Sequence, residues 1–210
     1  MPRKPRQVFQ VIFGTSLIGV GISLNYLANL GLGPWGVFHD GLSKTIGITY
    51  GRTIIVTGVA VMLLWIPLKQ KPGLGTLIDI FLVGLVADTI ILYFEFSENI
   101  FLSLILILLG IISIGTGTAI YVGADLGVGP RDGIMVGLET LGIKIGTARN
   151  LIELIAFLTG WLLGGLVGYV TILFVIGIGP VVQLVLPYVC LLYTSPSPRD
   201  LSTSRMPSSA

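Results

Sequence analysis

The sequence predicts an all-α, polytopic helical membrane protein with six spanning helices, two short half-helices and two inverted repeats. Three observations lead to this fold class: the composition, the length of the apolar runs, and a motif that occurs once in each half. Of the 210 residues, 53% are hydrophobic and only 10% are charged, whereas an ordinary soluble domain carries about 25% charged residues. So few charges cannot cover the surface of a soluble fold.

The composition also excludes several classes of protein. The formal net charge is only +2 and the mean hydropathy is +0.96, so we expect no nucleic-acid partner. Cys190 is the single cysteine, which excludes a disulfide scaffold. Glycine, at 29 residues, is well above its usual share of about 7% and suits close helix packing in lipid.

The apolar runs set the expected crossings, because a spanning helix needs about 20 mainly apolar residues. In chain order the predicted spans are residues 8–30, 53–68, 74–94, 100–122 and two within 151–189, where Gly164, Gly165 and Gly168 mark a break. Basic residues precede the first run, as in a signal peptide. The run is long and no convincing cleavage site follows it, so we treat it as the first helix.

Two shorter stretches, residues 34–47 and 130–142, are predicted as half-helices. At about 1.5 Å per residue they reach only about 20 Å, which is too short to span unaided. Each begins with proline, which suits the first turn of a helix. We therefore expect re-entrant or interfacial half-helices, entered through turns that contain Gly31, Gly33, Pro34, Gly127, Gly129 and Pro130.

The two halves of the chain resemble each other. Residues 30–34 (LGLGP) align with residues 126–130 (LGVGP), and after a one-residue deletion Thr76 aligns with Thr171 and Asp88 with Gln183. Three crossings per half is an odd number, so the second half is expected to insert in the opposite orientation. The predicted units are a first repeat at 1–98, a second repeat at 99–189 and a tail at 190–210.

The distribution of basic residues favours a cytoplasmic N-terminus. With six spans, eight Lys or Arg side chains face the cytoplasm, and only Lys44 and Arg52 face outward. If the half-helices also spanned, seven Lys or Arg side chains would face the cytoplasm and three would face outward.

Ionisable side chains at membrane depth cost roughly 2.5–3.5 kcal/mol to insert, so they mark candidate sites for substrate binding or gating. Asp125, Arg131 and Asp132 flank the second Gly-Pro turn. They are interpreted either as an anion or carboxylate site at a helix N-terminus, or as a structural cap in which an Asp pairs with Arg131.

Arg149 and Glu153 lie four residues apart on one helical face, and we expect Glu153 to form a buried ion pair with Arg149 or with Arg131. We expect these two residues to join Asp125, Arg131 and Asp132 in one charged cluster. Pinning of the helix is favoured over a proton relay, because Glu153 lies only one turn into its apolar run.

Asp88 and Gln183 occupy equivalent positions and predict a polar pair between the repeats. The two interpretations are transport or proton coupling, and an interhelical hydrogen bond that holds the repeats together. His39, with Asp40, is expected as an interfacial anchor. Asp79 is expected to be solvated or paired with Lys71.

Trp35, Trp65 and Trp161 are interpreted as interface anchors. No catalytic, cofactor or metal-ligand constellation is found, so we expect neither an enzyme nor a bound metal or cofactor.

Several of these residues also carry a family resemblance. The stretches 30–35 (LGLGPW), 124–133 (ADLGVGPRDG), 160–165 (GWLLGG) and 178–183 (IGPVVQ) resemble the motifs of the YczE/YyaS/YitT group of bacterial membrane proteins. Gly36 departs from this pattern, because the group often has Asp after the Trp. The resemblance implies a multi-pass protein of the bacterial cytoplasmic (inner) membrane without a defined biochemistry.

The leading functional hypothesis is a small-solute transporter or exporter, whose partners are the lipid bilayer, a small-molecule solute and, as one alternative, a second copy in a homodimer. The other hypothesis is a non-transporting membrane accessory or scaffold protein. Transport predicts a polar path that joins Asp88, Gln183 and the two Gly-Pro turns. An accessory protein predicts dry packing there and an exposed face of small residues.

The tail differs in kind from the rest of the chain. Residues 190–210 are rich in Ser and Pro, lack periodicity and resemble translated sequencing-adapter DNA. We predict that they take no part in the fold; the alternative is a genuine disordered cytoplasmic tail.

Overall fold

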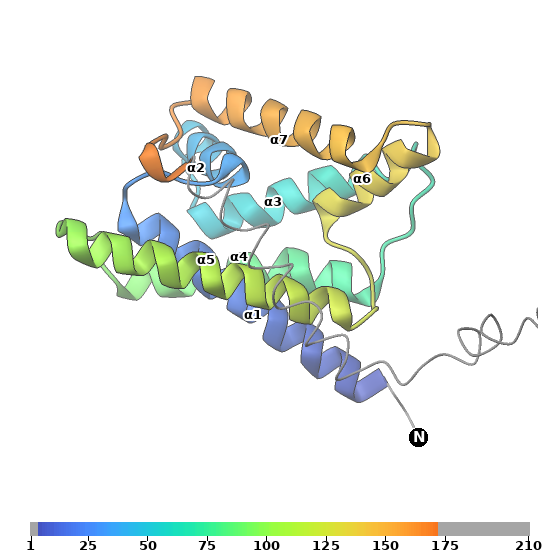
Figure 1. Ribbon diagram of the computed structural model, residues 1–210, viewed down its shortest axis with the longest axis horizontal. Helices are drawn as coiled ribbons and strands as arrows, with labels where there is room; N and C mark the ends of the chain where they lie inside the picture. The colour runs from blue at the N-terminus through green and yellow to red at the C-terminus, as the bar shows by residue number, and fades with distance from the viewer. Residues whose placement is uncertain (1–3, 172–210) are drawn as a thin grey trace, which may run out of the picture.

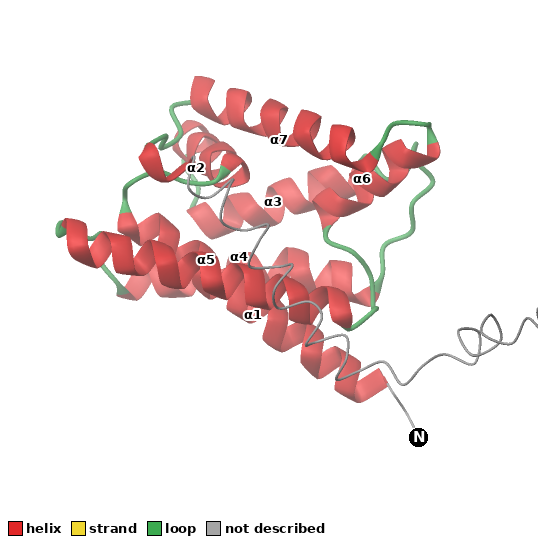
Figure 2. Cartoon of the chain, in the orientation of Figure 1, coloured by secondary structure: helices red, strands yellow, loops and turns green. Residues whose placement is uncertain are grey.

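The computed structural model describes residues 4–171, and the regular structure in this part of the chain is helical throughout (Figures 1 and 2). Its helices are α1 (Lys4–Ala28), α2 (Pro34–Ile46), α3 (Tyr50–Leu63), α4 (Leu74–Tyr93), α5 (Ile100–Gly123), α6 (Pro130–Thr140) and α7 (Ile145–Leu162). The predicted helical class is therefore confirmed for this region. The second part of the 151–189 block, Gln183 and the tail lie outside the described residues.

The helices form two layers (Figure 1). In one layer, α1 lies between α5 and α4 and packs against both. In the other layer, α2 packs against α7, while α6 contacts both α3 and α7. The layers meet where α3 packs on α4, and buried side chains of α1, α2, α3 and α4 share one apolar core there.

Three helices are long and apolar enough to cross a membrane: Pro5–Ala28 within α1, Leu74–Tyr93 and Ile100–Gly123. A fourth crossing results if α2 and α3, which are bent by 107° at the loop between them, count as one broken span. The count of six remains a prediction.

The α-helical part of the predicted 53–68 span begins earlier and ends earlier than expected. α3 ends at Leu63, and tight turns then continue to Lys69, with hydrogen bonds from Leu64 N to Val61 O (3.0 Å) and from Lys69 N to Ile66 O (3.1 Å). Fourteen α-helical residues rise about 21 Å, so the α-helical part alone is shorter than the hydrocarbon core of about 30 Å.

Both half-helices begin at the predicted prolines, Pro34 and Pro130. Each buries one face: Val37, Asp40, Gly41 and Ser43 in α2, and Gly133, Ile134, Met135 and Gly137 in α6. The half-helices are thus packed into the protein.

Glycines bring α1 and α5 together in antiparallel orientation. A Cβ at Gly14 would lie 2.8 Å from the carbonyl oxygen of Gly117, and a Cβ at Gly21 would lie 2.6 Å from that of Gly110. Since real Cβ atoms do not approach a carbonyl oxygen so closely, only glycine fits at this crossing.

The two turns before the half-helices have the same backbone conformation. Asn29 and Asp125 both have positive φ angles, of 55° and 52°, and Gly31 and Gly127 have φ of 117° and 132°. The sequence similarity between the two halves therefore extends to the local structure of their turns.

The half-helices also make matching contacts. A Cβ at Gly41 in α2 would lie 2.9 Å from Leu163 Cβ, just after α7, and a Cβ at Gly137 in α6 would lie 2.8 Å from Leu68 Cβ, just after α3. Each half-helix therefore packs against the end of a helix from the other half.

Candidate functional site: a central cavity

The two Gly-Pro turns border two adjoining pockets, which share part of their walls and which we describe together as two lobes of one central cavity. The smaller lobe, about 100 Å³, is bordered by Gly129 and Pro130 at the start of α6, and we call it the α6 lobe. The larger, about 280 Å³, is bordered by Gly33 and Pro34 at the start of α2, and we call it the α2 lobe. The two lobes share the wall residues Ile18, Ile22, Trp35, His39 and Arg131.

The α6 lobe contains two carboxylates. Asp132 Oδ2 and Asp79 Oδ2 lie 3.0 and 3.8 Å from the position that a Cβ of Gly129 would occupy. Arg131 lines the same lobe and lies within electrostatic range of Asp79. The expectation that Asp79 is solvated or paired with Lys71 is wrong, because α4 directs this side chain into the cavity wall.

The α2 lobe contains the predicted ion pair of α7. Arg149 Nε lies 3.1 Å from Glu153 Oε1, and both residues line the lobe together with Arg131. Glu153 is only 25% exposed. The structure therefore brings three residues of the predicted charged cluster, Arg131, Arg149 and Glu153, to one cavity.

The other two members of that cluster lie elsewhere. Asp132 lines the α6 lobe, and Asp125 is an exposed turn residue that borders neither lobe. The N-cap of α6 is Gly129, with no side-chain hydrogen bond. Within residues 4–171, Arg131 has no ion pair, so the structural interpretation of an Asp cap paired with Arg131 does not describe this turn.

Aromatic rings form the wall between the lobes. His39 lies between Trp35 and Tyr50, with ring centroids 6.0 and 6.2 Å away. His39 and Trp35 both border the cavity. Their expected role as interface anchors is therefore wrong, because α2 lies against α3 and α7 with this face inward.

Several polar atoms in the cavity wall lack hydrogen-bond partners. These are both amide atoms of Asn25, the indole Nε1 of Trp35 and the hydroxyls of Thr57 and Tyr121. Asn25 is 3% exposed and Thr57 is 6% exposed. Since a buried polar group without a partner costs roughly 1–3 kcal/mol, these atoms indicate a place for water or a polar ligand.

The prediction that Trp65 is an interface anchor is wrong, because its side chain is buried inside the protein. It is 2% exposed, its Nε1 donates a 2.8 Å hydrogen bond to the carbonyl oxygen of Pro130, and its ring covers Gly133. Trp65 thus fixes the start of α6 to the end of α3. Trp161, in contrast, is 59% exposed, as an interface anchor would be.

Asp40 is a buried contact point between the two halves. Its carboxylate accepts hydrogen bonds from Lys44 Nζ (2.7 Å), from the backbone N–H of Leu166 (2.7 Å) and from the Tyr26 hydroxyl (3.4 Å). Lys44 Nζ also donates to the carbonyl oxygen of Gly164 at 3.2 Å. Asp40 therefore fixes α2 to the loop after α7 rather than acting as an interfacial group.

Asp88 is a residue of α4 whose side chain lies against the N-terminus of α3. Its carboxylate accepts hydrogen bonds from the Thr49 hydroxyl, from Gly51 N (2.6 Å) and from Arg52 N (3.1 Å). Within the described region, Asp88 thus bonds to its own half of the chain. Its expected pairing with Gln183 falls on a residue outside that region.

The fold, the apolar helices and this partly polar interior define an α-helical membrane protein. The chain belongs to the family of unknown function DUF6198, whose model matches residues 5–187. It is therefore a bacterial membrane protein of the YczE/YyaS type, as its motifs suggest.

Three relatives illustrate the family. An uncharacterized protein of Haemophilus influenzae is 38% identical over 87% of this chain and 84% of its own length. The uncharacterized membrane protein YczE of Bacillus subtilis is 32% identical over 83% of this chain and 82% of its own. The uncharacterized protein YyaS of the same organism is 29% identical over 84% and 90%. No solved structure matches the chain.

Proposed function

We propose that the protein is a small-solute transporter of the bacterial cytoplasmic membrane, built from two inverted repeats. The observation that carries this proposal is the convergence of both Gly-Pro turns on one cavity with unpartnered polar atoms in its wall. Transporters of the inverted-repeat type bind their substrates where broken or half-helices from the two repeats meet.

The contacts between the halves support inverted repeats. Adding 96 to Gly14 and Gly21 gives Gly110 and Gly117, so the Gly14–Gly117 and Gly21–Gly110 contacts exchange under the repeat symmetry. The same exchange relates the Gly41–Leu163 contact to the Gly137–Leu68 contact. Because α1 and α5 cross antiparallel, the symmetry axis lies across these helices, as an axis in the membrane plane would.

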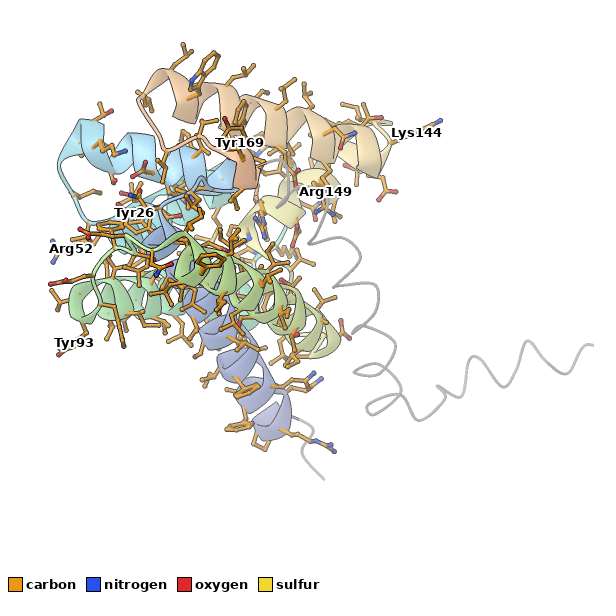
Figure 3. All side chains as sticks on the ribbon, turned by 60° about the vertical axis from the view of Figure 1, so that its left-hand side comes forward. Tyr26, Arg52, Tyr93, Lys144, Arg149 and Tyr169 are labelled. Atoms are coloured by element: carbon orange, nitrogen blue, oxygen red, sulfur yellow. The ribbon has the colours of Figure 1, made fainter. Side chains whose placement is uncertain are left out.

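The positions of the charged residues support the proposed orientation. Arg52 and Lys144 lie at opposite ends of the molecule (Figure 3). Lys44 lies at the opposite end from Lys144 as well, because its Nζ bonds to Gly164 just after the C-terminus of α7, whereas Lys144 is the N-cap of that helix. With the Lys144 end in the cytoplasm, the larger group of basic residues is inside.

The alternative of a non-transporting accessory protein predicts an exposed stripe of small residues for a partner. The glycines of α1 and α5 face each other instead, so this stripe is used within the chain. We therefore favour transport.

A cysteine-accessibility experiment tests the proposal. In a Cys190→Ser background, a membrane-impermeant maleimide is applied to either side of sealed vesicles that carry Thr57→Cys, a near-isosteric change in the cavity wall. A transporter predicts labelling from at least one side. Cysteines at positions 44 and 144 serve as markers that should label from opposite sides, and Leu85→Cys, 60% exposed on α4, serves as the lipid-facing control that should not label.

An accessory protein predicts that Thr57→Cys behaves like the Leu85→Cys control from both sides. Labelling of positions 44 and 144 from the same side would contradict the inverted-repeat arrangement.

A further inference from the structure

We propose that the α2 lobe binds the anionic group of a small solute, a carboxylate or a phosphate, with Arg131 as its counter-charge. The inference deepens the proposed function and rests on it, since it takes the central cavity as the substrate site. It follows from a surplus of positive charge and hydrogen-bond donors in the wall of this lobe.

The first part of that surplus is Arg131. It borders both lobes, and no carboxylate lies within ion-pair distance of it among residues 4–171. The carboxylate in the wall of the α2 lobe, Glu153, is already paired with Arg149. Arg131 is therefore a guanidinium of the α2 lobe that makes no direct ion pair within the described residues, although Asp79 lies within its electrostatic range. A guanidinium binds carboxylate or phosphate through two parallel hydrogen bonds.

The second part is a set of neutral donors around the same space. The indole N–H of Trp35 and the side-chain amide of Asn25 have no hydrogen-bond partner, and Asn25 is 3% exposed. α2 also begins at this lobe, with Gly33 as a cap that has no side-chain bond. The first intrahelical bond joins Val37 N to Gly33 O, so the backbone N–H groups of Trp35 and Gly36 precede it and are free for an acceptor.

Two further carboxylates near the cavity are consistent with an anionic group in the α2 lobe, because of where they lie. Asp79 and Asp132 border the α6 lobe and not the α2 lobe. An anion in the α2 lobe meets Arg131 in its wall, whereas these two carboxylates line the other lobe. A volume of about 280 Å³ is slightly below the range for drug-sized ligands, which points to a small solute.

Binding to three probes with the same ring tests the inference. Isothermal titration calorimetry compares benzoate, benzylammonium and benzyl alcohol at constant ionic strength, with the full chain in phosphatidylcholine nanodiscs. Inorganic phosphate is a fourth probe. We expect benzoate or phosphate to bind, and the cationic and neutral probes to bind at least tenfold more weakly. Equal or stronger binding of benzylammonium would overturn the inference, because the Asp79 and Asp132 side would then select the ligand.

Variants of arginine locate the site. Arg131→Gln should weaken anion binding by about tenfold or more, since hydrogen bonds to charged groups are the strong ones. Arg131→Lys should retain part of the binding. The matched control is Arg52→Gln, an arginine outside both lobes, which should bind as the unmodified chain does. Unchanged binding in Arg131→Gln would overturn the inference, and if that variant fails to fold, the comparison of probes on the unmodified chain decides.

Nanodiscs that contain phosphatidylglycerol distinguish a lipid headgroup from a free solute. If this lipid blocks benzoate binding to the unmodified chain, the anion is a headgroup and the assigned chemistry stands. If it has no effect while benzoate binds, the anion is a free solute. If neither the anions nor the lipid binds, the inference is overturned.

The two proposals fail separately. Anion binding combined with an inaccessible Thr57→Cys would contradict transport and leave the anion site intact. An accessible cavity that does not select anions would leave transport intact and remove the anion site.

Discussion

Gly14 and Gly117 lie back to back where α1 crosses α5, and a Cβ on either residue would come within 2.8 Å of the other's carbonyl oxygen. In lipid, helices associate through close packing rather than through exclusion of water, so backbone contact of this kind stabilises the pair. The contact holds one layer of the molecule together, and the proposed symmetry axis relates it to the Gly21–Gly110 contact.

We expect Gly14→Ala to destabilise the folded protein by about 1–3 kcal/mol, because the added methyl group meets backbone that cannot move away. Thermal unfolding in detergent gives the comparison. The matched control is Gly146→Ala in α7, where a Cβ would meet nothing within 4 Å. This control should be neutral or stabilising by up to about 1 kcal/mol, because alanine favours a helix. Equal effects of the two changes would contradict the close contact.

A second prediction concerns Trp65 and Gly133, whose contact attaches α6 to α3. Gly133→Ala should lower the melting temperature, since the indole ring occupies the space of the new methyl group. Trp65→Leu should be destabilising alone but should reduce the cost of Gly133→Ala in the double variant. A double-mutant cycle measures this coupling. Additive effects would show that the ring and the glycine do not compete for the same space.

The Asp40 contacts predict a graded response. Asp40→Ala removes the acceptor of the Leu166 N–H and of Lys44, and should destabilise by at least about 1–3 kcal/mol. Asp40→Asn retains an acceptor oxygen and should be milder. Glu139→Ala, an exposed carboxylate in the other half-helix, is the matched control and should have little effect. Stability that is the same in all three variants would mean that Asp40 does not hold α2 against the loop after α7.

The role of Asp88 as a cap leads to the next prediction. Asp88→Ala should cost about 0.5–2 kcal/mol, the range measured for lost helix caps, and should increase hydrogen exchange at the N-terminus of α3. Thr89→Ala is the control: Thr89 is an exposed residue of α4, the helix that carries Asp88, and among the described residues its hydroxyl bonds to Leu85 O alone. If exchange at Gly51 and Arg52 does not change, the cap is not needed for this helix end.

Local signals in the sequence predict much of the fold. The prolines at 34 and 130 mark the starts of both half-helices, and the glycines at 164, 165 and 168 mark the end of α7, because these residues act on the backbone of their own turn. The long apolar runs likewise predict α4 and α5 to within one residue.

The wrong predictions for Asp40, Trp65 and Asp79 have a common physical reason. Asp40 bonds to Leu166, a residue 126 positions away. Trp65 bonds to Pro130, and Asp79 turns toward Gly129 rather than Lys71. Such partners depend on how the two layers pack together. The composition or spacing of a single segment therefore does not predict them. The Arg149–Glu153 pair was predictable because its partners share one helical turn.

The most direct test of the account locks each end of the molecule in turn and asks from which side the cavity opens. The pair Gly41→Cys with Leu163→Cys closes one end, and the pair Gly137→Cys with Leu68→Cys closes the other. The Cβ positions of these pairs lie 2.9 and 2.8 Å apart, so each half-helix has to move away from its neighbour by about 1 Å to reach the roughly 3.8 Å of a disulfide. Thr57→Cys, protected during cross-linking, then reports access in a Cys190→Ser background. The account predicts that the 41–163 lock leaves position 57 open only to the cytoplasm and that the 68–137 lock leaves it open only to the outside. Access that is unaffected by either lock, or absent with both, would contradict a solute pathway through this cavity.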